Sequence, residues 1–194
     1  MWGKPCLAYN VQASFPVTAH GDIAAVQDHL KTLRLPQLRV PPPHAQHVSI
    51  YALVPVRWPD ADKEDYWNEI STAAISSLQA LCVDRRRFEL RFDRLQLTPS
   101  AIIAVAAETP DLIADIREHF HRTPGRPHLP KPVYDIVHTT LARFERAEHV
   151  SEAIMREVST MDISLTVEVE HLCLVRECVY PSLVLDEIVR FNLR

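Results

Sequence analysis

The sequence predicts an α+β fold in which antiparallel sheets line a central groove and helices cover the outside. Two observations favour this class: strand-like and helix-like segments are interleaved along the chain, and each half holds strands close enough in sequence to pair as hairpins. Of the 194 residues, 47% are apolar, which is enough for a full core. No change in composition separates the two halves, so we expect residues 1–194 to form a single domain.

The first half is expected to contain two strands and two helices. A strand is expected over residues 6–11, followed by a helix with Asp22 as its N-cap and apolar residues at helical spacing. The run Pro41–Pro43 forces an extended connection into a strand over 47–56. The longest helical pattern covers 60–83, and we interpret its apolar stripe as core. The apolar positions of the two helices are Ile23, Val26, Leu30 and Leu33, and Trp67, Ile70, Ala74, Leu78 and Leu81.

The second half is richer in strands. Alternation of Phe88, Leu90 and Phe92 with charged residues predicts a half-exposed strand that forms a hairpin with 102–107. Thr109-Pro110 predicts a helix with threonine as N-cap and proline at its first position. The remaining elements are expected as a loop over 122–132, a strand over 134–144, a helix over about 146–160, a strand over 163–169, and closing strands over 172–176 and 184–191.

The same short motif occurs once in each half, as His47-Val48-Ser49-Ile50 and as His138-Thr139-Thr140-Leu141. On a strand, a histidine and the hydroxyl residue two positions later share a face. If the two strands are neighbours, the four side chains form one patch with two proton-transfer groups and two neutral hydrogen-bond donors, which suits a phosphodiester. With ten histidines in the chain, either motif alone would more often be a chance match. Prolines before both motifs and a helical pattern after both indicate a duplicated unit.

The paired motifs resemble those of the 2H phosphoesterase superfamily, whose members include the 2′-5′ RNA ligase-like proteins and the cyclic nucleotide phosphodiesterases. Leu141-Ala142-Arg143-Phe144 continues the second motif as in many members, and residues 174–193 resemble their C-terminal hairpin. Ser49 stands where threonine is commoner. Arg143 lies an odd number of positions from His138, so strand alternation places it on the opposite face unless the strand bulges. The resemblance implies a single bilobal domain of two pseudo-symmetric lobes, each with one motif.

The resemblance also implies a metal-independent phosphoesterase that hydrolyses, or reversibly ligates, a small cyclic or 2′-linked nucleotide phosphodiester such as a 2′,3′-cyclic phosphate. His47 and His138 would be the general acid and base, because an imidazole with a pKa near about 6.5 reaches both forms at neutral pH. Ser49 and Thr140 would bind the non-bridging phosphate oxygens. Which histidine is the acid stays open. The alternative is a non-catalytic module of the same fold that binds nucleotides or RNA ends, but two retained titratable residues favour the enzyme.

Composition excludes several other classes of function. Acidic residues outnumber basic ones by 25 to 21, and this balance argues against a protein that grips long nucleic acid. Three glycines cannot build a glycine-rich phosphate loop, and the four cysteines lack metal-ligand spacing. No apolar run approaches the length of a membrane span. We therefore expect a cytoplasmic monomer that needs no cofactor or metal ion and acts on a small nucleotide or an RNA terminus.

Three further residues are candidates for substrate contact: Tyr180, Arg126 and Lys131. Tyr180 precedes a proline in a predicted loop, where its ring could stack on a base. Arg126 and Lys131 lie in the basic, proline-rich loop after the third helix, where they could contact phosphate. The histidines that border this loop are His119, His121 and His128. A metal site made by these histidines is the weaker alternative to an ordinary solvated helix end, where basic groups are favoured.

Overall fold

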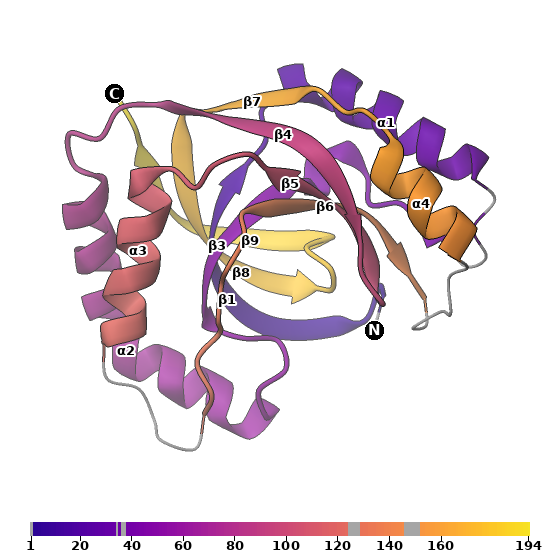
Figure 1. The fold of residues 1–194 in the computed structure, drawn as a ribbon. Coiled ribbons are helices and arrows are strands. Elements are labelled where there is room, and N and C mark those ends of the chain that lie inside the picture. Colours follow the sequence, from indigo (N-terminus) through magenta and orange to yellow (C-terminus); the bar gives the residue numbers. More distant parts are fainter. Residues whose placement is uncertain (1, 34, 36–37, 124–128, 146–151) are drawn as a thin grey trace.

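The computed structural model describes residues 2–33, 35, 38–123, 129–145 and 152–194 (Figure 1). The strands are β1 (Pro5–Ser14), β2 (Leu38–Arg39), β3 (His47–Val54), β4 (Phe88–Leu97), β5 (Ala101–Ala106), β6 (His138–Phe144), β7 (Leu165–Val169), β8 (His171–Val179) and β9 (Val184–Asn192). The helices are α1 (His20–Thr32), α2 (Asp60–Cys82), α3 (Asp111–Arg122) and α4 (Glu152–Thr160), with short 3-10 turns at Val17–Ala19 and Pro43–Ala45.

These strands form one nine-stranded sheet that curls into a half-barrel, with the helices outside it (Figure 1). Its order is β7-β4-β5-β6-β3-β1-β8-β9, and β2 pairs with β6 off this path. Every pairing between these strands is antiparallel. The predicted α+β class, with antiparallel sheet inside and helices outside, is confirmed.

The two halves of the sheet meet at the strands that carry the motifs. β6 is the last strand of one half and β3 the first of the other, and their register joins one pair of residues, Val48 opposite Thr139. Continued along both antiparallel strands, this register sets His47 across from Thr140 and Ser49 across from His138. The fold thus brings together two histidines that lie far apart in the sequence.

The helices pack on the outer side of the curled sheet and leave its inner side for the groove. α2 and α3 pack against β1, β3 and β9, whereas α1 and α4 pack against β6 and β4. One core cluster fills the space between sheet and helices, and each helix contributes to it, as shown by Ile23, Leu78, Ile113 and Val158. The two predicted apolar stripes, on α1 and α2, contribute buried or partly buried residues to this core.

Three predicted element boundaries are wrong for local reasons. The turn at Val17–Ala19 runs directly into α1, so Asp22 lies in the first turn of this helix rather than at its N-cap. Pro110, not Thr109, is the N-cap of α3, because its backbone is still extended at ψ 144°. The strand predicted from residue 134 begins at His138. The predicted start of the last helix, near residue 146, lies outside the described residues.

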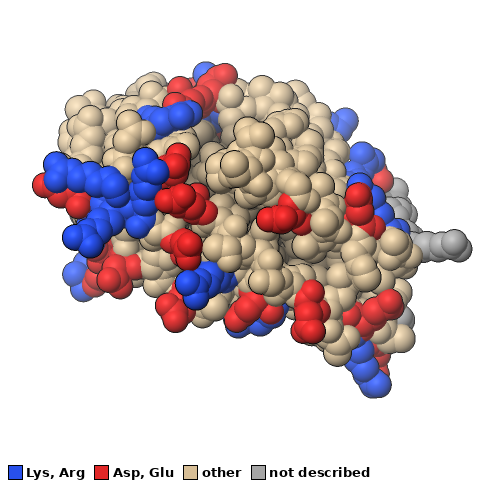
Figure 2. Space-filling model, turned by 90° about the horizontal axis from the view of Figure 1, so that it is seen from above, with Lys and Arg blue, Asp and Glu red and all other residues tan. Residues whose placement is uncertain are grey.

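The surface mixes charges of both signs. Figure 2 shows basic and acidic side chains interspersed on the face drawn, without a continuous basic track. Exposed ion pairs such as Arg87–Glu170 and Arg190–Glu187, both at 2.7 Å, neutralise part of the basic charge. Such pairs contribute about 0 to 1 kcal/mol each to stability. Among the residues that the structure describes, no helix combines the length and apolar character of a membrane span.

Candidate active site

The two motif strands share an irregularity that aims their side chains. In β3 the partners of neighbouring β1 residues jump from Tyr51 to Ser49, and in β6 the partners of neighbouring β5 residues jump from Ala142 to Thr140. Each strand therefore holds one extra residue immediately after its hydroxyl residue, which is a β-bulge. The bulge shifts the alternation by one position at the same place in both copies. Duplication thus extends from the sequence motif to the backbone.

A cavity of about 370 Å³ opens over these strands. This volume lies within the range of small-ligand sites. His47, Ser49, His138 and Thr140 all line it, so the structure brings the four predicted motif side chains together. The other polar or aromatic residues of its wall are Asn10, Gln46, Arg57, Tyr134, Thr139, Arg143, Glu177, Tyr180 and Ser182.

The His47 ring is held in one tautomer. Its Nδ1 lies 2.9 Å from the carbonyl oxygen of Ala45, which can only accept, so Nδ1 carries the proton. In the neutral ring Nε2 is then the acceptor, 3.2 Å from the hydroxyl oxygen of Ser49. Burial lowers the pKa of His47 and the positive charge of Arg143 lowers it further, while the hydrogen bond to Ala45 opposes both. Neutral His47 therefore presents a lone pair toward the motif hydroxyl.

The pKa of His138 also lies below that of an ordinary histidine. Burial is the main cause that lowers its pKa to about 4, and the nearby charges of Arg143, His47 and Arg117 act in the same direction. Asp135 opposes them. In the ligand-free site both imidazoles are therefore neutral near pH 7, which corrects the expectation of ordinary pKa values for the pair. Near pH 7 a protonated imidazole here requires an anion in the cavity.

Arg143 is the main correction to the sequence analysis. Because of the bulge in β6, its side chain lies on the same face as His138 and lines the cavity rather than the opposite side of the sheet. Its guanidinium lies 5.3 Å from the centre of the Tyr180 ring, a cation–π contact. Within the described chain its buried Nε has no hydrogen-bond partner. An unpaired buried donor costs about 1 to 3 kcal/mol, so an acceptor on a bound ligand would be favoured here.

Comparison with known proteins finds likeness only at the level of structure. No protein-family model and no curated protein matches the chain. TT0787 of Thermus thermophilus matches with a TM-score of 0.60 and 20% identity over 96% of this chain and 98% of that one. A phosphoesterase matches with a TM-score of 0.64 and 16% identity over 96% and 98%. Escherichia coli LigT, solved with 3′-AMP, matches with a TM-score of 0.60 and 14% identity over 98% and 99%.

The chain has the 2H phosphoesterase fold. This confirms the predicted arrangement of sheet and helices, and it agrees at the level of the fold with the resemblance inferred from the two motifs. With identities no higher than 20%, the likeness concerns the fold, and the chemistry of the cavity has to be argued from its own residues.

Beneath the cavity, buried amides tie the two halves of this 2H fold together. The Thr139 hydroxyl donates to Gln46 Oε1 at 3.0 Å, which links the second motif to the residue that precedes the first. Gln27 Nε2 on α1 donates at 3.0 Å to the carbonyl oxygens of both Pro41 and Leu141. Each motif is thus anchored to the segment that leads into the other or to the helix behind it. Such contacts fix the relative position of the two histidines.

Arg117 on α3 replaces strand pairing where the motif strands separate. Its Nε donates to the carbonyl oxygen of Ile50 at 3.2 Å and its Nη2 to that of Ile136 at 3.0 Å. The guanidinium also lies 4.9 Å from the centre of the Tyr134 ring. The Tyr134 hydroxyl in turn accepts a hydrogen bond of 2.7 Å from the amide of Ala52. One side chain therefore holds the residues that precede His138 against β3.

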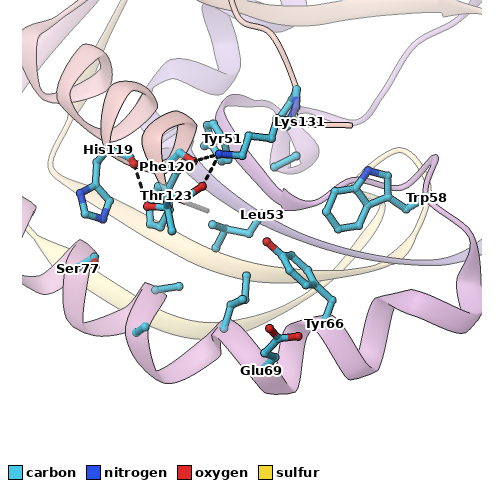
Figure 3. Close-up of a pocket in the computed structure, with 15 residues that line it drawn as sticks. Tyr51, Leu53, Trp58, Tyr66, Glu69, Ser77, His119, Phe120, Thr123 and Lys131 are labelled. Atoms are coloured by element: carbon cyan, nitrogen blue, oxygen red, sulfur yellow. Dashed lines mark hydrogen bonds between the residues drawn. The ribbon is translucent and has the colours of Figure 1, made fainter. Parts of the chain in front are cut away.

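The three further contact candidates have different outcomes. Tyr180 lines the cavity beside Arg143, as required of a residue that contacts the ligand. Arg126 lies outside the described residues. Lys131 does not line this cavity: its Nζ donates to carbonyl oxygens at the C-terminal end of α3, those of His121, at 2.5 Å, Phe120, at 3.4 Å, and Thr123. Figure 3 shows the bonds to Phe120 and Thr123. The carbonyl groups left unpaired at a helix end attract this cation, so the structure places Lys131 away from the four motif side chains.

Lys131 belongs instead to the wall of a second cavity of about 200 Å³ between α2, α3 and β3 (Figure 3). Its wall is mostly apolar and includes Tyr51, Trp58 and Phe120. In the part of the chain that the structure describes, no group of three or more His, Cys, Asp or Glu side chains is arranged to hold a metal ion. His128, one of the three histidines weighed for such a site, lies outside that part.

Several cavity residues were missed by the sequence analysis altogether, among them Arg57, Glu177 and Asn10. Glu177 on β8 and Asn10 on β1 lie on neighbouring strands and line one end of the cavity. Glu177 follows Arg176 at the end of the apolar run Leu172–Val175 in β8, and two charged residues in a row gave no signal that one of them is buried. Asn10 lies in a strand with Gln12, where polar residues alternate with apolar ones, a pattern that gives no hint of a site.

Proposed function

We propose that this chain is a metal-independent phosphodiesterase that acts on a small cyclic or 2′-linked nucleotide phosphodiester, such as a 2′,3′-cyclic phosphate. The observation that carries the proposal is the convergence of two histidines, two hydroxyls and a guanidinium with an unpaired buried donor in one cavity. This set can hold a phosphoryl group and move one proton onto and one proton off its oxygens.

In the proposed reaction His47 is the base. The bond from Nδ1–H to Ala45 fixes Nε2 as the proton acceptor, and in the free site this acceptor is occupied by the Ser49 hydroxyl. When Ser49 turns to donate to a phosphate oxygen, Nε2 becomes available to a water molecule. The water oxygen then forms a bond to phosphorus while its proton passes to Nε2 of His47. This sequence couples phosphate binding to release of the base.

His138 is the acid. The negative phosphate raises its pKa from about 4, because an opposite charge favours the protonated imidazole. As the bond from phosphorus to the 2′ or 3′ oxygen breaks, His138 gives its proton to that oxygen. Arg143 and Thr140 stabilise the non-bridging oxygens during this in-line transfer. The reverse sequence forms a phosphodiester, so hydrolysis and ligation share these roles.

Two further observations support a small nucleotide as the substrate. Escherichia coli LigT, whose fold this chain shares, has been solved with 3′-AMP, with ATP and with NADP⁺. Basic and acidic side chains are mixed on the molecular face shown in Figure 2, which offers no track for a long polyanion. We propose accordingly that the protein binds nucleotides or RNA ends and needs neither cofactor nor partner.

The test is a substrate panel assayed with EDTA present. It contains the four 2′,3′-cyclic nucleotides, 2′-5′-linked dinucleotides and their 3′-5′ isomers. We expect turnover of the cyclic or 2′-linked compounds by the wild type and loss of turnover in His138→Ala. Tight binding of the same compounds without turnover would instead support the non-catalytic module. Turnover that requires a divalent ion would contradict the metal-free mechanism.

A further inference from the structure

One end of the motif cavity carries a fixed carboxylate. The Glu177 side chain is 5% exposed, yet it lines the cavity. Its Oε1 accepts a hydrogen bond of 2.8 Å from the amide of Ser182, and its Oε2 accepts one of 3.2 Å from Asn10 Nδ2. These two bonds hold the carboxylate in one orientation. Burial raises the pKa of Glu177, but both bonds and the nearby Arg143 oppose that rise.

The charges that line the cavity nearly cancel. Glu177 is the only acidic residue among the described residues of its wall, and the permanent cations there are Arg57 and Arg143. Before a ligand binds, both imidazoles are neutral, so two positive charges face one negative charge. The remaining single positive charge matches a phosphodiester, which carries one negative charge. It does not match a ligand that brings a phosphomonoester as well.

From this juxtaposition we infer that Glu177 makes the site selective for ligands that have neutral hydrogen-bond donors, such as ribose hydroxyls, beside the bound phosphate. Ligands that carry a second phosphate at this position are disfavoured. The inference rests on the proposed function, in that it assumes a nucleotide in this cavity. A carboxylate accepts hydrogen bonds from hydroxyl and amino groups but repels an anion. Glu177 is thus a specificity residue, while the phosphoryl group itself is bound by the motif residues and Arg143.

The test compares two ligands that differ by one 5′-phosphate, 3′-AMP and adenosine 3′,5′-bisphosphate, whose binding is measured by calorimetry. Both contain the same 3′-phosphomonoester, which the proposed reaction cannot consume, so its contribution cancels in the ratio of their affinities. Wild type should bind 3′-AMP at least about fourfold more tightly, the value for two like charges about 5 Å apart in bulk water. Glu177→Gln should bring the ratio of the two affinities near one, because it removes the negative charge that repels the 5′-phosphate. The glutamine amide should keep its position, since its oxygen can accept from Ser182 and the Asn10 amide can rotate to accept from its nitrogen. Glu187→Gln on β9, which removes the same charge outside the cavity wall, should leave the ratio unchanged.

Each outcome decides the matter. Equal or tighter binding of the bisphosphate by wild type overturns the inference, and this measurement needs no variant to fold. An unchanged ratio in Glu177→Gln overturns it as well, as does the failure of both ligands to bind. The expected ratios without any turnover of the cyclic nucleotides would leave the selectivity standing and refute the proposed phosphodiesterase activity.

Discussion

Protonation of His138 should cost folding stability at mildly acidic pH. Its folded-state pKa of about 4 lies below the value of about 6.5 of an unfolded chain, so the unfolded state binds the proton more readily. The stabilising contribution is therefore complete above pH 6.5 and is lost as the pH falls toward 4. Linkage over this interval predicts a loss of about 2 kcal/mol between pH 8 and pH 5 from this one group.

Replacement by a side chain that does not titrate isolates this contribution. The free energy of unfolding, measured by urea denaturation at pH 8 and pH 5, should fall by about 2 kcal/mol less in His138→Gln than in wild type. Arg143→Met should recover part of the same stability, because its charge is the second cause of the lowered pKa. His29→Gln, at an exposed position of α1, is the matched control. An equal loss of stability in wild type and His138→Gln would refute the reasoning.

Four further predictions concern activity. His47→Ala and His138→Ala should each lower kcat by roughly 10²-fold or more, and Ser49→Ala and Thr140→Ala by less, since each removes a donor and no proton transfer; near-normal rates in either histidine variant would contradict the mechanism. Exhaustive EDTA treatment should leave kcat unchanged, and recovery only with a specific divalent ion would count against it. Because both histidines have pKa values below 6.5 in the free site, kcat/KM should already be declining with rising pH below pH 6.5, whereas the alkaline limb of kcat lies at higher pH in the complex. Arg117→Met should lower kcat more than it raises KM, because it removes the support of the segment before His138. It should also move the pH profile to higher pH, because it removes a charge that lowers the pKa of His138. An unmoved profile would leave Arg117 with a purely structural role.

Local patterns in the sequence were enough to predict most of the elements and the motif residues. Period-two alternation at Phe88 to Phe92 and helical spacing along 60–83 both reflect burial on one side of an element, which the residues themselves encode. The duplicated motif was enough to predict that its four side chains lie together, because the two short strands have equal bulges and so present these side chains in the same way. What could be read from one strand or one helix was therefore predicted well.

Features that depend on contacts between distant segments were not predicted. The bulge that turns Arg143 toward the cavity is visible only in the pairing of β6 with β5. Lys131 donates to carbonyl oxygens at the end of α3, a contact that no local pattern specifies. Glu177 gained its position because β8 pairs with β1, the strand that also carries Asn10. For Arg143 and Glu177 the side chain is placed by pairing with a strand far away in the sequence.

The bulges place Ala52 in β3 at the position that Arg143 has in β6, and both residues line the cavity. A strictly two-fold site would accept a diester with two unlike arms in either direction, and only one direction would set the leaving oxygen beside the acid. Half of the bound molecules would then be unproductive and would act as inhibitors. The guanidinium of Arg143 on one side and the methyl group of Ala52 on the other would favour one of the two binding directions. The charged phosphate oxygens would bind on the Arg143 side, and the bulkier arm of the diester would fit on the Ala52 side. The difference between Ala52 and Arg143 would thus help to fix the direction in which the duplicated scaffold binds its substrate.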